Sequence, residues 1–190
     1  MTTPDNPNDI VSNGYDKIGN RYSEWGETHR DDSRQRYTQV LVDHASRGMR
    51  LLDLGCGNGL PTTKLLSTRY RVTGIDGSPV QIAQATRNVP RGQFICADIA
   101  TVHFPPESFD AICAFYSIIH VPRTEHAGLF QRINRWLRPN GIFVGCLTTA
   151  DMPADYIDDW LGVPMYWSGV TQGLMWKQFT NMAMMSRFCG

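Results

Sequence analysis

Short apolar runs alternate with helical segments along most of this chain. The runs lack a polar residue at every second place, which is typical of strands buried on both faces of a sheet. We expect such strands at residues 50–54, 70–75, 93–97, 110–115 and 141–147. Helices are expected at residues 34–45, 60–66 and 125–137, and a further helix is expected to begin at Ser78-Pro79. Thr124 is the expected N-cap of the helix at 125–137, and Arg138–Gly141 is expected to form a turn. This order predicts a doubly wound α/β domain whose mainly parallel sheet has five recognisable strands and helices on both faces.

The composition narrows the classes of partner. The 190 residues fit one compact domain, and Lys plus Arg equal Asp plus Glu at 18 each. A net charge of zero provides no basic surface for nucleic acid or an anionic membrane, and no apolar run is long enough to span a bilayer. Five cysteines without a CxxC pair indicate reduced core thiols of a cytoplasmic protein, without a disulfide framework or a metal site. A small-molecule partner is the expectation that remains.

A glycine-rich loop follows the first predicted strand. It reads Asp53-Leu54-Gly55-Cys56-Gly57-Asn58-Gly59, and its glycines let the backbone turn sharply and approach a ligand closely. A tight strand-to-helix turn without any ligand is the alternative interpretation. The dinucleotide fingerprint requires Gly-x-Gly-x-x-Gly, and Leu60 occupies its last position. The loop therefore argues against a nicotinamide cofactor.

Carboxylates end three successive strands. Asp53, Asp76 and Asp98 close the first, second and third strand, so a parallel sheet should bring them to one edge. Asp76 can accept hydrogen bonds from two ribose hydroxyls, Asp98 from an adenine amino group, and Asp53 can face a cationic amine. The alternative for Asp53 and Asp98 is a plain helix N-cap. Their coincidence favours an adenosyl ligand that carries an amine.

These segments resemble class I S-adenosylmethionine-dependent methyltransferases, which have a Rossmann-like fold. Leu51–Gly59 looks like the first family motif and Val72–Ser78 like the second, while Ala97-Asp98-Ile99 resembles the adenine-binding segment. Ser108–Ile112 and Leu137–Gly141 resemble the entry to the fourth strand and the turn before the fifth. The resemblance covers about Tyr15 to Leu147 and implies S-adenosylmethionine as cofactor, with S-adenosylhomocysteine as product.

The resemblance also implies a role for each matching residue. Gly55, Cys56 and Gly57 would contact the methionine part through their backbone, and Asp53 would hold its amino group directly or through water. Asp76 would bind the ribose, and Asp98 with Ile99 would clasp the adenine. The full set of expected cofactor residues is Tyr15, Tyr22, Asp53, Gly55, Cys56, Gly57, Gly59, Asp76, Gly77, Ser78, Gln81, Asp98, Ile99 and Phe115.

His120 and Tyr116 are the candidate catalytic residues, in the loop after the fourth strand. An unperturbed histidine pKa suits a general base near neutral pH. The alternative for His120 is a structural histidine that bonds a neighbouring loop, and for Tyr116 a packing aromatic. His126, on the next helix, is expected to be exposed.

The segments at both ends of the chain carry weaker expectations. Residues 1–12 read as a flexible tail, 13–31 as a lid with Tyr15 and Tyr22, 32–150 as the cofactor domain, and 151–190 as an atypical cap. Gly162 and Pro164 favour loops that line an acceptor pocket, and the alternative is that the apolar side chains of residues 160–168 belong to the core. From residue 171 the chain reads as one helix, so we do not expect the usual C-terminal strand pair of the family. A homodimer through this region stays open.

Three functions are compatible with these patterns. The first is methyl transfer to a small apolar or aromatic acceptor, with an oxygen, nitrogen or carbon nucleophile. The second is a catalytically silent protein that binds S-adenosylmethionine as a scaffold. The third is a relative that uses the bound cofactor to shape a pocket for another reaction, such as a cyclisation.

Overall fold

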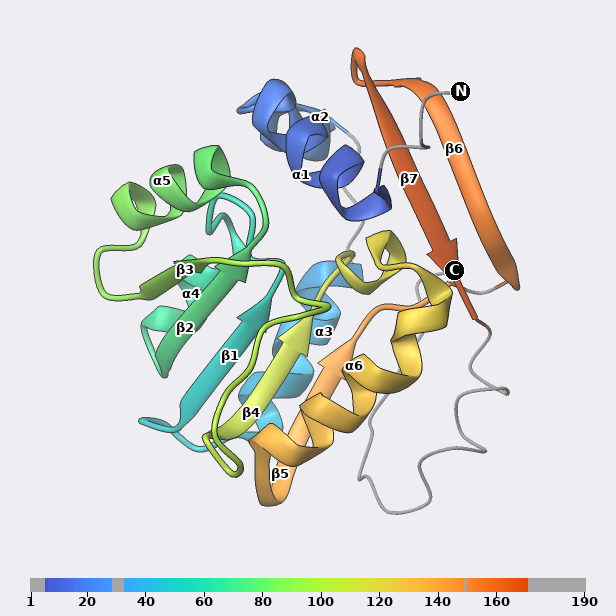
Figure 1. Cartoon of the computed structure of the whole chain (residues 1–190). Helices are drawn as coiled ribbons and strands as arrows, with labels where there is room; N and C mark the ends of the chain where they lie inside the picture. Colours follow the sequence, from blue (N-terminus) through green and yellow to red (C-terminus); the bar gives the residue numbers. More distant parts are fainter. Residues whose placement is uncertain (1–5, 29–32, 149, 171–190) are drawn as a thin grey trace.

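The computed structural model describes residues 6–28, 33–148 and 150–170, and its centre is a five-stranded parallel sheet (Figure 1). The strand order is β3-β2-β1-β4-β5. The strands are β1 (Arg50–Leu54), β2 (Arg71–Asp76), β3 (Gln93–Cys96), β4 (Phe109–Ala114) and β5 (Leu137–Gly145). The predicted fold class is confirmed. The order reverses between β1 and β4, which is where open α/β sheets bind ligands.

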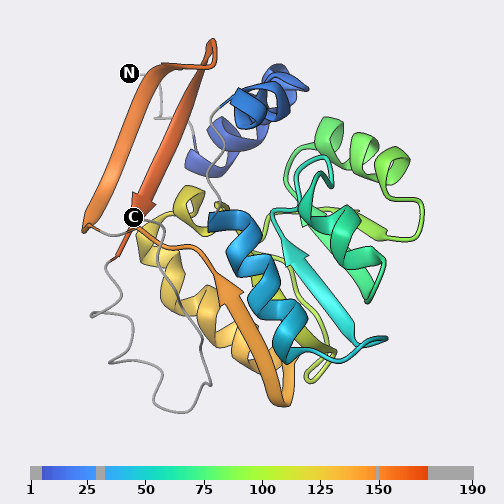
Figure 2. The ribbon, with the colours of Figure 1, turned by 180° about the vertical axis from the view of Figure 1, so that it is seen from behind.

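Helices cover both faces of the sheet. They are α3 (Ser33–His44), α4 (Thr62–Ser67), α5 (Pro79–Asn88) and α6 (Arg123–Trp136), with a 3-10 turn η1 (Ile118–His120) before α6. Leu52 and Ile112 point to the face that α6 covers, whereas their neighbours Leu51 and Ala111 point to the face that α3 and α4 cover. Figure 2 views the molecule from behind, so that α3 lies in front of the sheet and α6 lies on its other side. This alternation within fully apolar strands is what a sheet buried on both faces requires.

Some local expectations are wrong. β3 is the edge strand, and three of its four residues are exposed. The N-cap of α6 is Pro122 and no side chain caps it, so Thr124 lies inside the helix. His126 is buried, not exposed, because the helix face that it shares with Leu129 and Phe130 turns toward the sheet. These differences arise from sheet order and helix phase, which the local pattern does not determine.

The segment Arg138–Gly141 belongs to β5 and does not form a separate turn. Its pairing is interrupted, since Phe109 lies opposite Leu137 and Ala111 lies opposite Ile142. β5 therefore has more residues than β4 between these two pairs. Within this irregular stretch, Asn140 adopts the left-handed conformation with φ of 64°. The start of β5 is therefore a strongly irregular strand.

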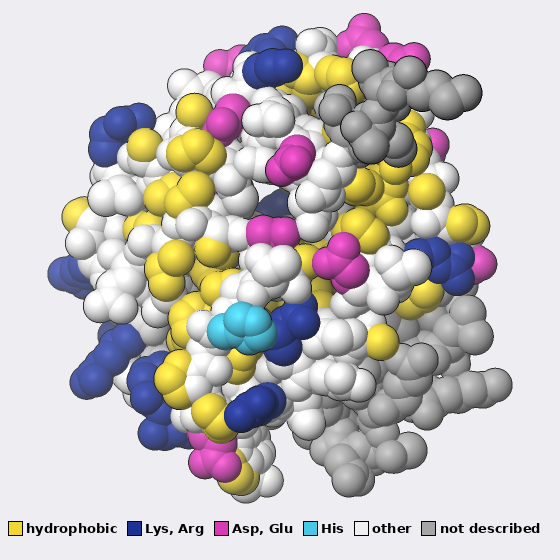
Figure 3. Space-filling view, viewed as in Figure 1, with side chains coloured by type: hydrophobic (Ala, Val, Ile, Leu, Met, Phe, Trp, Pro, Cys, Tyr) yellow, Lys and Arg dark blue, Asp and Glu magenta, His cyan; other side chains and the backbone are white. Residues whose placement is uncertain are grey.

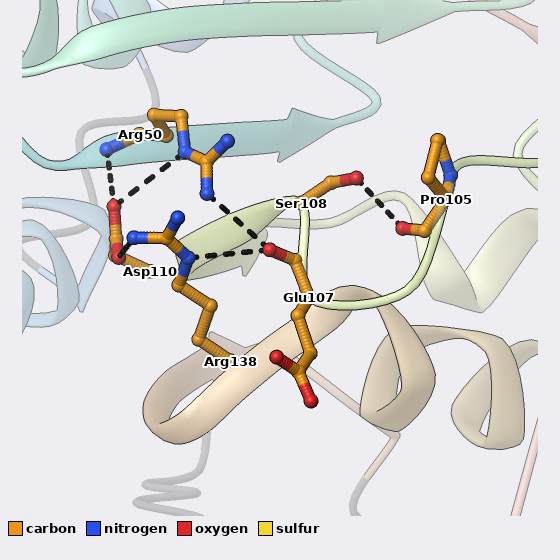
Figure 4. A network of polar contacts seen from close by, with 6 residues as sticks. All are labelled: Arg50, Pro105, Glu107, Ser108, Asp110 and Arg138. Carbon is orange, nitrogen blue, oxygen red and sulfur yellow. Dashed lines mark hydrogen bonds and ion pairs between the residues drawn. The ribbon is translucent and has the colours of Figure 1, made fainter.

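An ion-pair network ties this irregular start to β1 and β4 (Figure 4). The Asp110 carboxylate accepts a hydrogen bond from the Arg50 backbone N–H at 2.8 Å and from Arg138 Nη1 at 3.1 Å. Both guanidinium groups also donate to the carbonyl oxygen of Glu107. The two motifs around residues 108–112 and 137–141 thus hold the sheet together at the amino ends of its strands, far from the ligand edge.

The segment after β5 forms a β-hairpin, which corrects the prediction of loops without a strand pair. Strand β6 (Met152–Trp160) pairs antiparallel with β7 (Val163–Gly169) in a separate two-stranded sheet. Leu161 and Gly162 link them with φ of 54° and 81°, as a tight two-residue hairpin turn requires. Within the part of the chain that the structure describes, the central sheet has five strands, as expected. The helix expected beyond residue 170, and the dimer contact placed there, lie outside the described residues.

Residues 6–12, which were expected to belong to a flexible tail, form the N-cap and the first turns of a helix. Helix α1 (Pro7–Ile18) begins behind the N-cap Asn6, and α2 (Arg21–Thr28) follows it. Ile18 of α1 packs with Val163 and Met165 of β7 in a small apolar core of its own. We call α1, α2 and the β6–β7 hairpin the cap, and it stands over the ligand edge of the sheet (Figure 1). No helix in the described ranges is long and apolar enough to cross a membrane.

Candidate functional site

The glycine loop is built by backbone hydrogen bonds at the end of β1. The N–H groups of Gly55 and Cys56 both donate to the carbonyl oxygen of Ile75, at 2.8 and 2.9 Å. Gly55 has φ of 76°, and a Cβ placed on it would lie 2.2 Å from the Cβ of Ser117. A side chain at position 55 is excluded by both strain and space. The loop is thereby held close to the segment that follows β4.

Asp76 is the centre of polar contacts at the end of β2. Its carboxylate accepts hydrogen bonds from the N–H groups of Gly57 at 2.9 Å and Ser78 at 3.0 Å. Burial raises the pKa of Asp76 to about 6, although these two donors oppose the shift. Ser78 caps α5 as expected, because its Oγ accepts from the N–H of Gln81. A carboxylate oriented by two backbone donors is a pre-formed acceptor for a ligand diol.

A cavity of about 300 Å³ lies at this edge, between the strand ends and the cap. On the face shown in Figure 3, the surface is hollowed just below α1, and acidic side chains lie around the hollow. The predicted residues that line the cavity are Tyr15, Tyr22, Gly55, Cys56, Gly57, Asp76, Gly77, Ser78, Gln81, Asp98, Ile99, Phe115, Tyr116 and His120. The fold therefore brings fourteen of the sixteen predicted site residues to one cavity.

Asp53 and Gly59 do not line the cavity. Asp53 is 3% exposed and points to the α4 face of the sheet, where it accepts from Thr63 Oγ1 at 2.6 Å and from the Cys113 thiol at 3.5 Å. Burial raises the pKa of Asp53. At Gly59, a Cβ would lie 2.9 Å from Val89 Cγ2, so this glycine permits packing against α5. The structure gives both residues a supporting position beneath the loop.

His120 is fully engaged between the sheet and the cap. Its Nδ1 lies 2.8 Å from the carbonyl oxygen of Tyr166 in β7, and its Nε2 lies 3.0 Å from the hydroxyl of Tyr15 in α1. A carbonyl can only accept, so Nδ1 carries the proton and the Tyr15 hydroxyl donates to Nε2. Burial lowers the pKa of His120 to about 4, against the opposing hydrogen bond to Tyr166. The imidazole is therefore neutral near pH 7, and Tyr15 covers its basic nitrogen.

Tyr116 also lines the cavity and has φ of 61°. The Arg34 guanidinium stacks over its ring, 4.8 Å from the centroid, and also donates to the Tyr22 hydroxyl at 3.3 Å. Arg34 is the one Lys or Arg among the described residues that line the cavity. Sequence reasoning missed Arg34, because an arginine on a surface helix carries no local signal.

Comparisons with known proteins agree with this geometry. Residues 52–145 match a family described as a methyltransferase domain. The sterol 24-C-methyltransferase erg6 of Aspergillus fumigatus is 36% identical over 103 residues, which are 50% of this chain and 27% of that protein. The 27-O-demethylrifamycin SV methyltransferase of Amycolatopsis mediterranei is 32% identical over 162 residues, 74% of this chain and 58% of that protein. A solved DhpI–SAH complex shares the fold, with a TM-score of 0.74 at 22% identity over 94% of this chain and 88% of that one.

Over residues 52–145 this chain belongs to the S-adenosylmethionine-dependent methyltransferases, and the described residues share their class I fold. The match with the two relatives spans less than two thirds of the length of each, since it covers 27% of the sterol enzyme and 58% of the rifamycin enzyme. The matched family segment, residues 52–145, includes the glycine loop, Asp76 and Asp98. The cap hairpin lies beyond the matched family segment, which ends at residue 145.

The cavity of this methyltransferase fits the cofactor of its family. The backbone N–H of Ile99 makes no hydrogen bond to any described residue, and Ile99 lines the cavity beside Asp98. A free donor next to a carboxylate matches the ring nitrogen and amino group along one edge of adenine. Asp76 suits the ribose, and Arg34 suits a carboxylate. The further lining residues that the sequence did not indicate are Asn6, Asn8, Asp9, Val11, Ser12, Arg34, Asn58, Leu60, Ser117 and Val121.

Proposed function

We propose that this chain transfers the methyl group of S-adenosylmethionine to a small acceptor that enters between the cap and the sheet. One observation carries the proposal: Asp76, Asp98 and the glycine loop meet at one cavity that the cap covers. The names of the relatives, a sterol and a rifamycin methyltransferase, support a small-molecule acceptor.

Each end of the cofactor has a matching group in the cavity. Asp76 would accept from the ribose hydroxyls, and Asp98 with the Ile99 N–H would hold the adenine. Arg34 would neutralise the carboxylate of the methionine part, because charge-assisted contacts of this kind favour arginine. Asp53 lies too deep to line the cavity, so its effect on the cofactor amine would pass through the loop that it supports. When bound, the cofactor supplies an activated methyl group.

Tyr15 and Tyr22 line the cavity and would receive the acceptor, while Trp160 and Trp167 do not line it and would support these rings from behind. Tyr15 packs edge-on against Tyr22 and Trp160, with ring centroids 5.6 and 5.9 Å apart, and Trp167 lies 5.5 Å from both His120 and Trp160. Such a wall excludes water from the transfer and favours an apolar or aromatic acceptor. The rings come from five elements, α1, α2, η1, β6 and β7, so the wall exists only where the assembled cap meets η1.

The proton of a hydroxyl or amine acceptor would leave through Tyr15 and His120. The Tyr15 hydroxyl faces the cavity and donates to His120 Nε2, so it can accept the acceptor proton while its own proton moves to that nitrogen. The hydrogen bond from Nδ1 to Tyr166 holds the required tautomer. Tyr116, which is stacked under Arg34, would orient the acceptor from the other side.

Binding and turnover test this function in turn. Purified protein is titrated with S-adenosylmethionine and S-adenosylhomocysteine, in wild type and in Asp76→Ala. We expect the wild type to bind both ligands. The affinity of Asp76→Ala should be at least tenfold lower, since both ribose hydroxyls would lose their contact with the carboxylate. Failure of the wild type to bind either ligand contradicts the proposal. Binding without methyl transfer across a panel of phenols, amines and thiols would favour the silent scaffold.

A further inference from the structure

The first turn of α1 lies against the adenine end of the cavity. Asn8 Nδ2 donates to Oδ2 of Asp98 at 2.8 Å, a contact between residues 90 positions apart. The other carboxylate oxygen of Asp98 accepts from the Ala100 N–H at 2.7 Å. The side chain of Asn6 caps α1 by accepting from the N–H of Asn8 at 3.2 Å. Hydrogen bonds therefore hold Asn8 at two points, its backbone N–H and its side-chain Nδ2.

The side-chain oxygen of Asn8, Oδ1, has no hydrogen-bond partner among the described residues. Asn8 also lines the cavity. Since Nδ2 and Oδ1 belong to one planar amide, anchoring Nδ2 on Asp98 also fixes the direction of Oδ1. Asn8, Asp98 and Ile99 all line the cavity, so an amide oxygen and a carboxylate that can accept lie beside an N–H that has no partner among the described residues.

We propose that Asn8 is a specificity-determining residue that recognises the adenine amino group together with Asp98. The amino group has two N–H donors, and the two acceptor oxygens take one each. A 6-oxo purine would instead turn a carbonyl oxygen toward both acceptors, which leaves them unpaired and repels the ligand. The inference rests on the proposed function, because it assigns a residue to the adenosyl end of the same site.

A purely structural role for Asn8 is the competing explanation. Helix α1 is also fastened to the sheet by Ser12, whose hydroxyl donates to the carbonyl oxygen of Gly77 at 2.7 Å. If Asn8 only docks α1, its removal would weaken every purine ligand equally. Ser12→Ala is therefore the matched control, since it loosens the same helix without touching the acceptor pair.

Calorimetric titration with two ligands separates the explanations. The probes are S-adenosylhomocysteine and S-inosylhomocysteine, which differ in the amino or oxo group on the purine. We expect Asn8→Ala to weaken the adenosyl ligand about tenfold without weakening the inosyl ligand, so that the preference falls by about that factor and Asp98 supplies the preference that is left. Ser12→Ala should weaken both ligands by the same factor and preserve the preference.

Two outcomes would overturn the inference. An equal loss for both ligands in Asn8→Ala would make Asn8 a docking residue, and unchanged affinity would remove it from the site. Because Asn8 is only half-buried on the first turn of α1, both variants should keep the wild-type melting temperature within a few degrees. If the wild type itself binds neither ligand, the proposed function fails, which is a result distinct from a failure at Asn8.

Discussion

At the scale of single residues, the site combines buried polar groups whose protonation is set by their surroundings. Asp76 is a carboxyl with a pKa of about 6, and His120 is an imidazole with a pKa of about 4. Burial moves both groups toward their neutral forms, because a low-dielectric site penalises either charge. Near pH 7 Asp76 is therefore an ionised carboxylate that can bind the ribose hydroxyls. His120 is neutral, so its Nε2 can take up a proton from the molecule that is methylated.

Binding of S-adenosylhomocysteine should depend on pH through Asp76. The free protein carries a neutral Asp76 below about pH 6, and a neutral carboxyl is a weaker acceptor for ribose hydroxyls. Affinity should therefore fall as pH drops through 6, by up to about tenfold per unit. Calorimetry between pH 5 and 8 measures this, and Asp76→Asn should give a flat profile. The same slope in both proteins would assign the dependence to another group.

Tyr15→Phe should separate chemistry from binding. The change removes the hydroxyl that covers His120 Nε2 but keeps the ring in the aromatic wall. We expect kcat to fall by about 100-fold or more, as for loss of a proton-transfer group, with cofactor affinity nearly kept. His120→Ala should act in the same way. Tyr22→Phe is the control, since its hydroxyl bonds Arg34 and not His120. Unchanged turnover in His120→Ala would leave His120 with only its structural contact to Tyr166.

At the scale of elements, helix α1 and strand β7 depend on close contact. Gly14 lies in the middle of α1, and a Cβ there would be 2.9 Å from Met165 Cε and 3.2 Å from the carbonyl oxygen of Pro164. The helix keeps a glycine because a larger residue would separate it from the hairpin. The positions of Tyr15 and of the Tyr166 carbonyl depend on this packing, so the packing of the cap positions both hydrogen-bond partners of His120.

Replacing Gly14 with alanine should destabilise the cap despite the better helix propensity. Overpacking costs about 1–3 kcal/mol, which exceeds the gain of about 1 kcal/mol from removing a helical glycine. Gly26→Ala in α2 is the matched control, because its Cβ would meet no atom within 4 Å, and it should stabilise by about 0.5–1 kcal/mol. Urea denaturation compares the two variants. A stabilised Gly14→Ala would mean that Met165 yields easily.

At the scale of the whole molecule, the two ends of the sheet have separate tasks. The carboxyl ends carry the cavity and the cap, and the amino ends carry the network around Asp110. Two of the five segments that resemble the family thus stabilise the fold without touching a ligand. The cap has its own apolar core at Ile18, Val163 and Met165, distinct from the two cores of the sheet.

Asp110→Ala should reduce stability and leave ligand affinity unchanged. It removes an acceptor for the Arg50 N–H and the ion pair with Arg138, at a cost of about 1–3 kcal/mol. Asp151→Ala breaks an exposed pair with Arg123 and should cost less than about 1 kcal/mol. Thermal melting and titration with S-adenosylhomocysteine test both. A weakened ligand in Asp110→Ala would show that the two ends are coupled.

The sequence by itself determined the sheet, the glycine loop and the strand-end carboxylates, because apolar runs, glycine conformation and capping are local properties. Only the tertiary structure decided where those groups point. The alternation of β1 directs Asp53 away from the cavity, and a left-handed Leu161-Gly162 turn makes a hairpin where loops were expected. Folding also brings Asn8 to Asp98 and Tyr15 to His120, across 90 and 105 positions. Contacts between distant segments depend on how elements pack, and no local pattern specifies that packing.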